Sequence, residues 1–83
     1  EPTKNLFSLY PNPANNQFTV ALPAYMREAT LSIYTNLGQL IYNEKLTKAG
    51  IHTIPIAASW NSGIYWVKVS QNGISTTQKL LIN

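Results

Sequence analysis

The sequence contains no cysteine, and only 11% of its 83 residues are charged. Without cysteine, neither a disulfide framework nor a thiolate metal site can stabilise the fold, so stability must come from apolar packing. A hydrophobic fraction of 45% is sufficient for this. No apolar run approaches the roughly 20 residues that span a bilayer, and no signal peptide is recognisable at the start. Because the chain begins at Glu1 without a methionine, we expect a single domain, residues 1–83, excised from a larger secreted protein.

The charge of the chain is small and dispersed. Six lysine and arginine residues against three glutamates give a net charge of +3, and the cations occur singly along the sequence. Nucleic-acid-binding proteins carry a basic stripe or a much steeper charge, so nucleic acid is not an expected partner. Asparagine, serine and threonine supply much of the polar surface, a composition that fits extracellular β-domains.

Few side chains could perform catalysis. The single histidine, His52, falls on a predicted strand, where we expect it to point outward, and no aspartate is present to orient its ring. The glutamates Glu1, Glu28 and Glu44 form no plausible glycosidase pair, and with one histidine they make a poor metal-ligand set. No glycine-rich phosphate loop or nucleophile elbow occurs. The sequence therefore predicts no enzymatic activity, no catalytic or metal site and no cofactor.

Apolar residues alternate with polar ones, and turn residues interrupt this pattern every eight to twelve positions, which is typical of all-β proteins. Seven short strands cannot bury an apolar face in a single flat layer. We therefore predict a small Ig-like antiparallel β-sandwich with Greek-key connections, in which Pro55 marks an edge strand. The predicted strands cover residues 6–10, 17–22, 29–35, 39–46, 51–56, 64–70 and 74–82.

The last hairpin allows a prediction of register. Asn72-Gly73 favours a two-residue type I′ turn, because both central positions of that turn need positive φ. Trp66 is then opposite Lys79 on the outer face, where a cation–π contact is expected. On the core face, the same register pairs Tyr65 with Leu80, Val67 with Gln78, and Val69 with Thr76.

Several aromatic residues leave the function open. Tyr10, Tyr25, Trp60 and Trp66 cannot all belong to the core, and exposed aromatic rings on a β-sandwich can stack on sugars. A carbohydrate-binding module is therefore one alternative. The other interpretation is structural, with Trp60 filling one end of the sandwich and the tyrosines covering its rim. A third possibility is a passive Ig-like spacer, which predicts that the parent chain continues beyond residue 83.

Three segments, in order, resemble one family. Residues 9–14 (LYPNPA) with 18–20 (FTV) resemble the opening of the type A C-terminal sorting domain of the type IX secretion system. Residues 31–42 (LSIYTNLGQLIY) are similar to its central hairpin. Residues 62–69 (SGIYWVKV), with 77–80 (TQKL), are similar to its closing motif. The resemblance extends from about residue 5 to residue 83.

This resemblance implies a function that composition cannot show. Such domains are C-terminal secretion signals that carry a passenger, located N-terminal to them, through the periplasm and across the outer membrane of Gram-negative bacteria. The expected partners are the outer-membrane components of the secretion system and a surface sortase-like protease, which removes the domain and anchors the passenger at the cell surface. The candidate recognition residues carried over by position are Pro11, Asn12, Pro13, Gly38, Gly63, Tyr65, Lys68 and Lys79. Trp66, on the same hairpin, is a further candidate.

The two prolines among these residues also have a simple structural explanation. Pro11 and Pro13 fix φ and keep the preceding residues out of helical conformation, which makes a stiff corner between the first two strands.

Trp66 departs from the family pattern, which has smaller residues there. As a mechanism, we expect the last hairpin, with Lys68, Lys79 and the Trp66 face, to meet a β-rich partner, with strand addition at an exposed edge as one mode.

Overall fold

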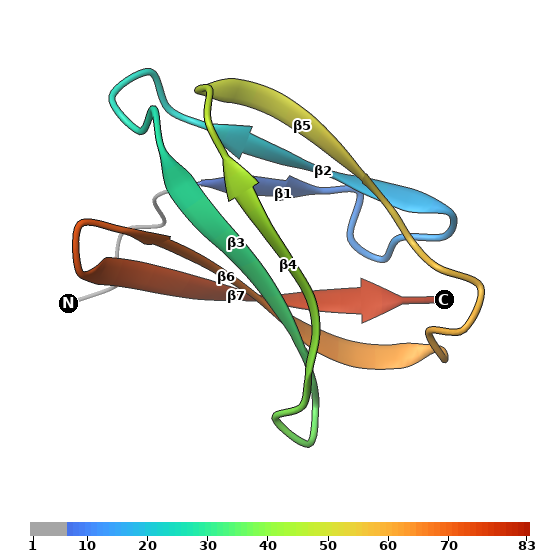
Figure 1. The fold of residues 1–83 in the computed structure, drawn as a ribbon. Helices are drawn as coiled ribbons and strands as arrows, with labels where there is room; N and C mark the ends of the chain where they lie inside the picture. The colour runs from blue at the N-terminus through green and yellow to red at the C-terminus, as the bar shows by residue number, and fades with distance from the viewer. Residues whose placement is uncertain (1–6) are drawn as a thin grey trace, which may run out of the picture.

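The computed structural model describes residues 7–83, which form seven strands in two sheets (Figure 1). The chain is all-β in this range, and no helix in it is long and apolar enough to cross a membrane. The strands are β1 (Ser8–Tyr10), β2 (Gln17–Leu22), β3 (Ala29–Thr35), β4 (Leu40–Leu46), β5 (Gly50–Pro55), β6 (Gly63–Gln71) and β7 (Ile74–Ile82).

The strand bounds agree closely with the alternation of the sequence. β2, β3 and β7 have the predicted limits. β4 begins one residue later than predicted, β5 and β6 differ by one residue at each end, and β1 begins at Ser8. Strand β6 is longer than predicted because its ladder to β7 continues from Gly63 to Gln71. Leu6, the predicted start of the first strand, lies outside the described residues.

One sheet has the strand order β1-β2-β5, and the other has the order β4-β3-β6-β7, with all named strand pairs antiparallel. The chain changes sheet after β2, after β4 and after β5, and β6 returns beside β3, as expected for Greek-key connections. The fold class predicted from the sequence is therefore confirmed. The edge position predicted from Pro55 is also confirmed, since β5 pairs only with β2.

The core lies between the two sheets and contains the inward side chains of both. Successive side chains of a strand point to opposite faces, so buried and more exposed residues alternate, most clearly along β2 and in the middle of β6. Each large apolar side chain buried in this way contributes about 1.5–3 kcal/mol, which is how an 83-residue chain without disulfides can fold. The largest fully buried side chains are Phe18, Val20, Leu31, Ile33, Leu46, Ile54, Val67, Val69 and Leu80.

The β6–β7 hairpin has the predicted register. Asn72 and Gly73 both have positive φ, 51° and 79°, as a type I′ turn requires. Gln71 is opposite Ile74, and Trp66 is opposite Lys79. The three core-face pairs are also as predicted: Tyr65 with Leu80, Val67 with Gln78, and Val69 with Thr76.

Two local features differ from the prediction. The β3–β4 ladder shifts register after Ile33, so that Tyr34 is opposite Leu40 and Ile41 is the extra residue of a β-bulge. Contrary to the prediction, the side chain of His52 does not point away from the core. It is opposite Val20 and has the same parity as buried Ile54, so it is half-buried on the inner side of its sheet.

Candidate recognition site

The predicted recognition residues occupy three connected places in the fold. Pro11, Asn12 and Pro13 form the loop that follows β1, and Gly38 lies in the β3–β4 turn. The other five belong to the β6–β7 hairpin. Contacts link these places, since Asn12 meets β7 and Trp66 meets the residues that precede Gly38. The structure thus brings together Asn12 and Lys79, two predicted recognition residues that are 67 positions apart in the sequence.

The loop after β1 is hydrogen-bonded to the free edge of β7. The side chain of Asn12 bonds to the backbone groups that a neighbouring strand would otherwise use. Its Nδ2 donates a 2.8 Å hydrogen bond to the carbonyl oxygen of Lys79, and its Oδ1 accepts one of 2.9 Å from the amide of Leu81. The prolines on either side have no N–H to offer, whereas a side-chain amide supplies both a donor and an acceptor. Asn12 therefore acts as a peptide group would in a neighbouring strand.

Ala14 continues this contact toward the end of the chain. Its amide donates to the carbonyl oxygen of Leu81 at 2.8 Å, and its carbonyl oxygen accepts from the amide of Asn83 at 2.9 Å. The contact is a parallel bridge between Ala14 and Ile82. We call residues 12–14 the clasp. Figure 1 shows the β1–β2 loop beside the C-terminal end of β7.

The clasp changes the expected mode of partner binding at the last strand. Strand addition needs free N–H and C=O groups along an edge. From Lys79 to Asn83 several of these groups already bond to the clasp. A strand added along this half of β7 would have to displace Asn12 and Ala14.

Tyr65 is a core residue. It is 6% exposed, and its hydroxyl donates a 2.6 Å hydrogen bond to the carbonyl oxygen of Asn61. Its ring stacks on Trp60 at a centroid distance of 6.1 Å, and Trp60 meets Tyr42 edge-on at 6.0 Å. Trp60 is half-buried against the core, so the structural interpretation of this tryptophan is confirmed.

The same aromatic cluster contains the one clearly perturbed titratable group of residues 7–83. Partial burial, the hydrogen bond that the Tyr42 hydroxyl donates to Glu44 Oε1, and the charge of Glu44 together raise the pKa of Tyr42 to about 12. Each of these causes favours the neutral phenol over the phenolate.

Gly38 completes the β3–β4 turn. Its φ of 89° lies in the left-handed region, which glycine adopts without a steric penalty. The amide of Gly38 donates to the carbonyl oxygen of Thr35 at 2.9 Å, and the Thr35 hydroxyl accepts from the amides of Leu37 and Gln39 at 3.2 Å each. Gly63, with φ 145°, opens β6. Both glycines therefore allow backbone conformations with positive φ, and neither has a side chain to offer a partner.

Trp66, Lys68 and Lys79 offer side chains to solvent on the β6–β7 hairpin, and Lys68 is half-buried. Pro11, Asn12 and Pro13 are exposed as well, in the loop after β1. Trp66 is 36% exposed, and its indole Nε1 donates a 3.2 Å hydrogen bond to Oδ1 of Asn36. Lys79 is opposite Trp66, as predicted, but the aromatic contacts of the described residues do not include the expected cation–π contact. Instead, the indole is held by the β3–β4 turn.

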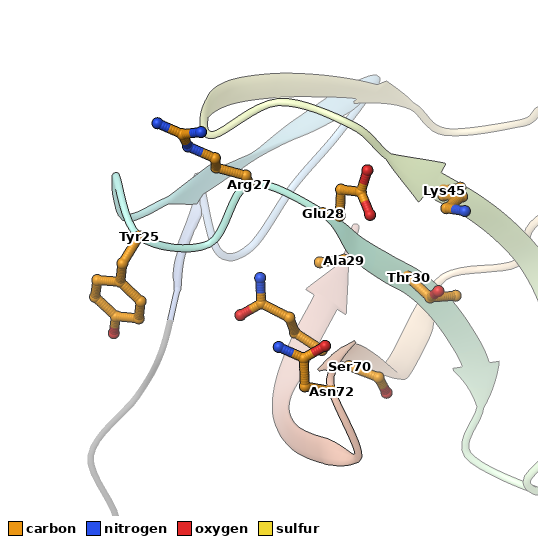
Figure 2. Close-up of a pocket in the computed structure, with 9 residues that line it drawn as sticks. Tyr25, Arg27, Glu28, Ala29, Thr30, Lys45, Ser70 and Asn72 are labelled. Atoms are coloured by element: carbon orange, nitrogen blue, oxygen red, sulfur yellow. The ribbon is translucent and has the colours of Figure 1, made fainter.

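A polar hollow that the sequence did not reveal lies at one end of the sandwich (Figure 2). It has a volume of about 480 Å³ and forms between the β2–β3 loop, which carries Tyr25, Arg27 and Glu28, and the end of the β6–β7 hairpin. No local signal marks these residues, because they meet only when the two turns come to the same end. Its lining is Tyr25, Arg27, Glu28, Ala29, Thr30, Lys45, Ser70, Gln71 and Asn72.

Comparison with known proteins gives one family. A family model described as a secretion system C-terminal sorting domain matches residues 8–83. No curated protein matches the chain. The matched range contains all seven strands and all nine predicted recognition residues. Within residues 7–83, no group of three or more histidine, cysteine, aspartate or glutamate residues could hold a metal ion.

Proposed function

The chain belongs to the family of secretion system C-terminal sorting domains, and we propose that it directs a passenger protein across the outer membrane through the type IX secretion system. Domains of this family are non-catalytic sorting signals for type IX secretion, which implies a passenger N-terminal to the domain and export to the cell surface or beyond. The observation that carries the proposal is the family match over residues 8–83.

The proposed sequence of events has three steps. The passenger first enters the periplasm, where it and the domain fold. Outer-membrane components of the secretion system then recognise the folded domain and move the protein to the surface. Finally, a surface sortase-like protease cuts before the domain and anchors the passenger. In this scheme residues 1–83 are one unit, the C-terminal sorting domain of a larger secreted protein.

We propose that direct recognition uses Trp66, Lys68 and Lys79. This assignment is supported by their position on the outer face of one hairpin, where their side chains reach solvent. The remaining candidates act through shape: Asn12 and its flanking prolines hold the clasp, the glycines set the turns, and Tyr65 fills the core. Docking on a sheet face also leaves the clasp in place.

The decisive experiment is secretion of a fluorescent reporter fused to residues 1–83. The fusion carries an inner-membrane signal and is expressed in matched strains with and without a working type IX translocon. We expect translocon-dependent appearance of the reporter outside the cell, while a fusion without residues 1–83 stays in the periplasm. Retention of the full fusion in the periplasm of both strains would contradict the proposal.

One observation favours a second function, carbohydrate binding. Tyr25 is 68% exposed beside the polar hollow, and Gln71 and Asn72 line that hollow with amides that can bond to sugar hydroxyls. A volume of about 480 Å³ is in the range of small-ligand sites. Retention of the domain on a polysaccharide column, lost in Tyr25→Ala and kept in Tyr10→Ala, would support this function. No retention of the unchanged domain would exclude it for the polysaccharides tested.

A further inference from the structure

The side of the four-stranded sheet that faces away from the core carries several exposed side chains, and the strand register fixes which residues lie on it. The inward positions of β3, β6 and β7 include Leu31, Ile33, Val67, Val69 and Leu80, so the intervening residues point outward. They form three cross-strand rows: Leu40, Tyr34, Trp66 and Lys79; Asn43, Ser32, Lys68 and Thr77; and Lys45, Thr30, Ser70 and Ser75. We call this surface the outer face.

The charged residues in the three rows are all lysines. Lys45, Lys68 and Lys79 lie on the outer face, one in each row. Glu44 is opposite core residue Leu31 and points to the other side, and Glu28, which precedes β3, borders the third row in the hollow that it lines together with Lys45. Lys68 and Lys79 are diagonal neighbours across the β6–β7 ladder, and strand geometry places their Cα atoms roughly 7–8 Å apart. That spacing is within the Debye length of about 8 Å at physiological salt, so the lysines reinforce one another's potential.

One end of the outer face is apolar. Trp66, Leu40, Ile64 and Leu81 are each 36–50% exposed, and half-buried Tyr34 lies between Leu40 and Trp66. Ile64 and Leu81 are cross-strand partners next to the Trp66–Lys79 pair. Grouped apolar side chains bordered by polar ones mark protein interaction sites, and aromatic residues are enriched in the centres of such interfaces.

We propose that the outer face docks an acidic protein surface, with Trp66 and its apolar neighbours at the centre and the three lysines paired with carboxylates. This inference rests on the proposed function and names the chemistry of its partner: the translocon component that receives the domain presents an acidic, partly apolar surface. It adds Lys45, Tyr34, Leu40, Ile64 and Leu81 to the predicted contact residues.

The shape of the outer face favours a protein over a lipid surface. A side chain that enters a membrane must protrude beyond its neighbours, whereas Trp66 and Ile64 already have about two thirds of their surface covered. Between the lysines lie the hydroxyl side chains of Thr30, Ser70, Ser75 and Thr77, whereas buried Ser32 already accepts a hydrogen bond from Asn43. The first four hydroxyls can form the direct hydrogen bonds of a protein–protein interface, which carries about one per 100–200 Å².

The test compares charge reversals in the secreted reporter fusion. Lys45→Glu and Lys48→Glu change the net charge equally and lie three residues apart, but only Lys45 is on the outer face, because Lys48 is in the β4–β5 loop. We expect Lys45→Glu and Lys79→Glu each to lower translocon-dependent export at least fivefold. Lys48→Glu and Lys45→Arg should keep wild-type export. Thermal unfolding of each domain separates loss of docking from loss of folding.

The outcomes distinguish this inference from the proposed function. If the wild-type fusion is not exported by the translocon, the proposed function fails. If it is exported and Lys45→Glu and Lys79→Glu are exported equally well, only the outer-face inference is overturned. Lysine-dependent sedimentation of the domain with vesicles containing phosphatidylglycerol, absent with pure phosphatidylcholine vesicles, would also overturn it in favour of a lipid surface.

Discussion

Asn12 donates a hydrogen bond from its side-chain amide to the backbone carbonyl of Lys79, 67 residues further along the chain. The same amide accepts from the next outward-facing amide of β7, that of Leu81. The first loop of the domain and its last strand are therefore joined by one side chain. The Pro-Asn-Pro segment forms the corner between β1 and β2, as predicted, and also covers part of the edge of β7.

Replacing Asn12 by aspartate should destabilise the domain. The carboxylate still accepts from Leu81, but it cannot donate to Lys79 and places a negative charge near that carbonyl oxygen. We expect a loss of about 1–3 kcal/mol in the free energy of unfolding, measured by urea denaturation. The matched control is Asn16→Asp, which makes the same charge change in the same loop and should be close to neutral. Equal effects of the two substitutions would contradict the role of the clasp.

The turn of the last hairpin gives a second prediction. Gly73 has a φ of 79°, and a Cβ added there would meet nothing within 4 Å, so the cost of a side chain is backbone strain alone. Gly73→Ala should therefore lower the free energy of unfolding by about 1 kcal/mol. Gly73→Asn should recover much of that loss, because asparagine tolerates the left-handed region. If Gly73→Ala and Gly73→Asn lower the free energy of unfolding equally, the positive φ at this position is not the cause of the loss.

Most of the fold could be predicted because its signals are local. Alternation alone places Phe18, Leu31 and Val67 in the core, and the Asn72-Gly73 turn fixes the pairing of nine residues of β6 with nine of β7. The β-bulge after Ile33 was not predicted, because no glycine or proline marks it. His52 was placed on the wrong face, although its even spacing from Ile54 indicates the inner side.

The candidate site was less predictable, since its contacts are not local. The sequence does not distinguish the roles of the family's motif residues, but the structure does. Tyr65 is buried in the core, exposed Asn12 is hydrogen-bonded to β7 through its side chain, and Trp66 and Lys79 are exposed on the last hairpin. The one-sided charge of the outer face was also hidden. Lys45, Lys68 and Lys79 are scattered along the sequence, and only sheet pairing brings them onto one surface.

The raised pKa of Tyr42 predicts a pH dependence of stability. In the unfolded chain a tyrosine ionises near pH 10, whereas in the fold Tyr42 holds its proton until about pH 12. The stabilisation of the neutral phenol is therefore complete below pH 10 and is lost as the pH rises toward 12. Urea denaturation at pH 8 to 12 should show a steeper fall for the wild type than for Tyr42→Phe. Parallel curves would show that Tyr42 titrates normally.

Tyr65 tests whether a family motif residue acts through folding or through contact. Tyr65→Phe keeps the stacking on Trp60 and the core packing but removes the hydrogen bond to the carbonyl of Asn61. We expect a loss of about 0.5–1.5 kcal/mol in the free energy of unfolding, an unchanged near-ultraviolet circular dichroism signal from Trp60, and normal export of the reporter fusion. The comparison is Trp66→Ala, which removes an exposed ring and should lower export far more than its effect on stability explains. If Tyr65→Phe abolished export while the domain stayed folded, the hydroxyl of Tyr65 would have to meet a partner despite being buried, and the assignment of Tyr65 to folding alone would be wrong.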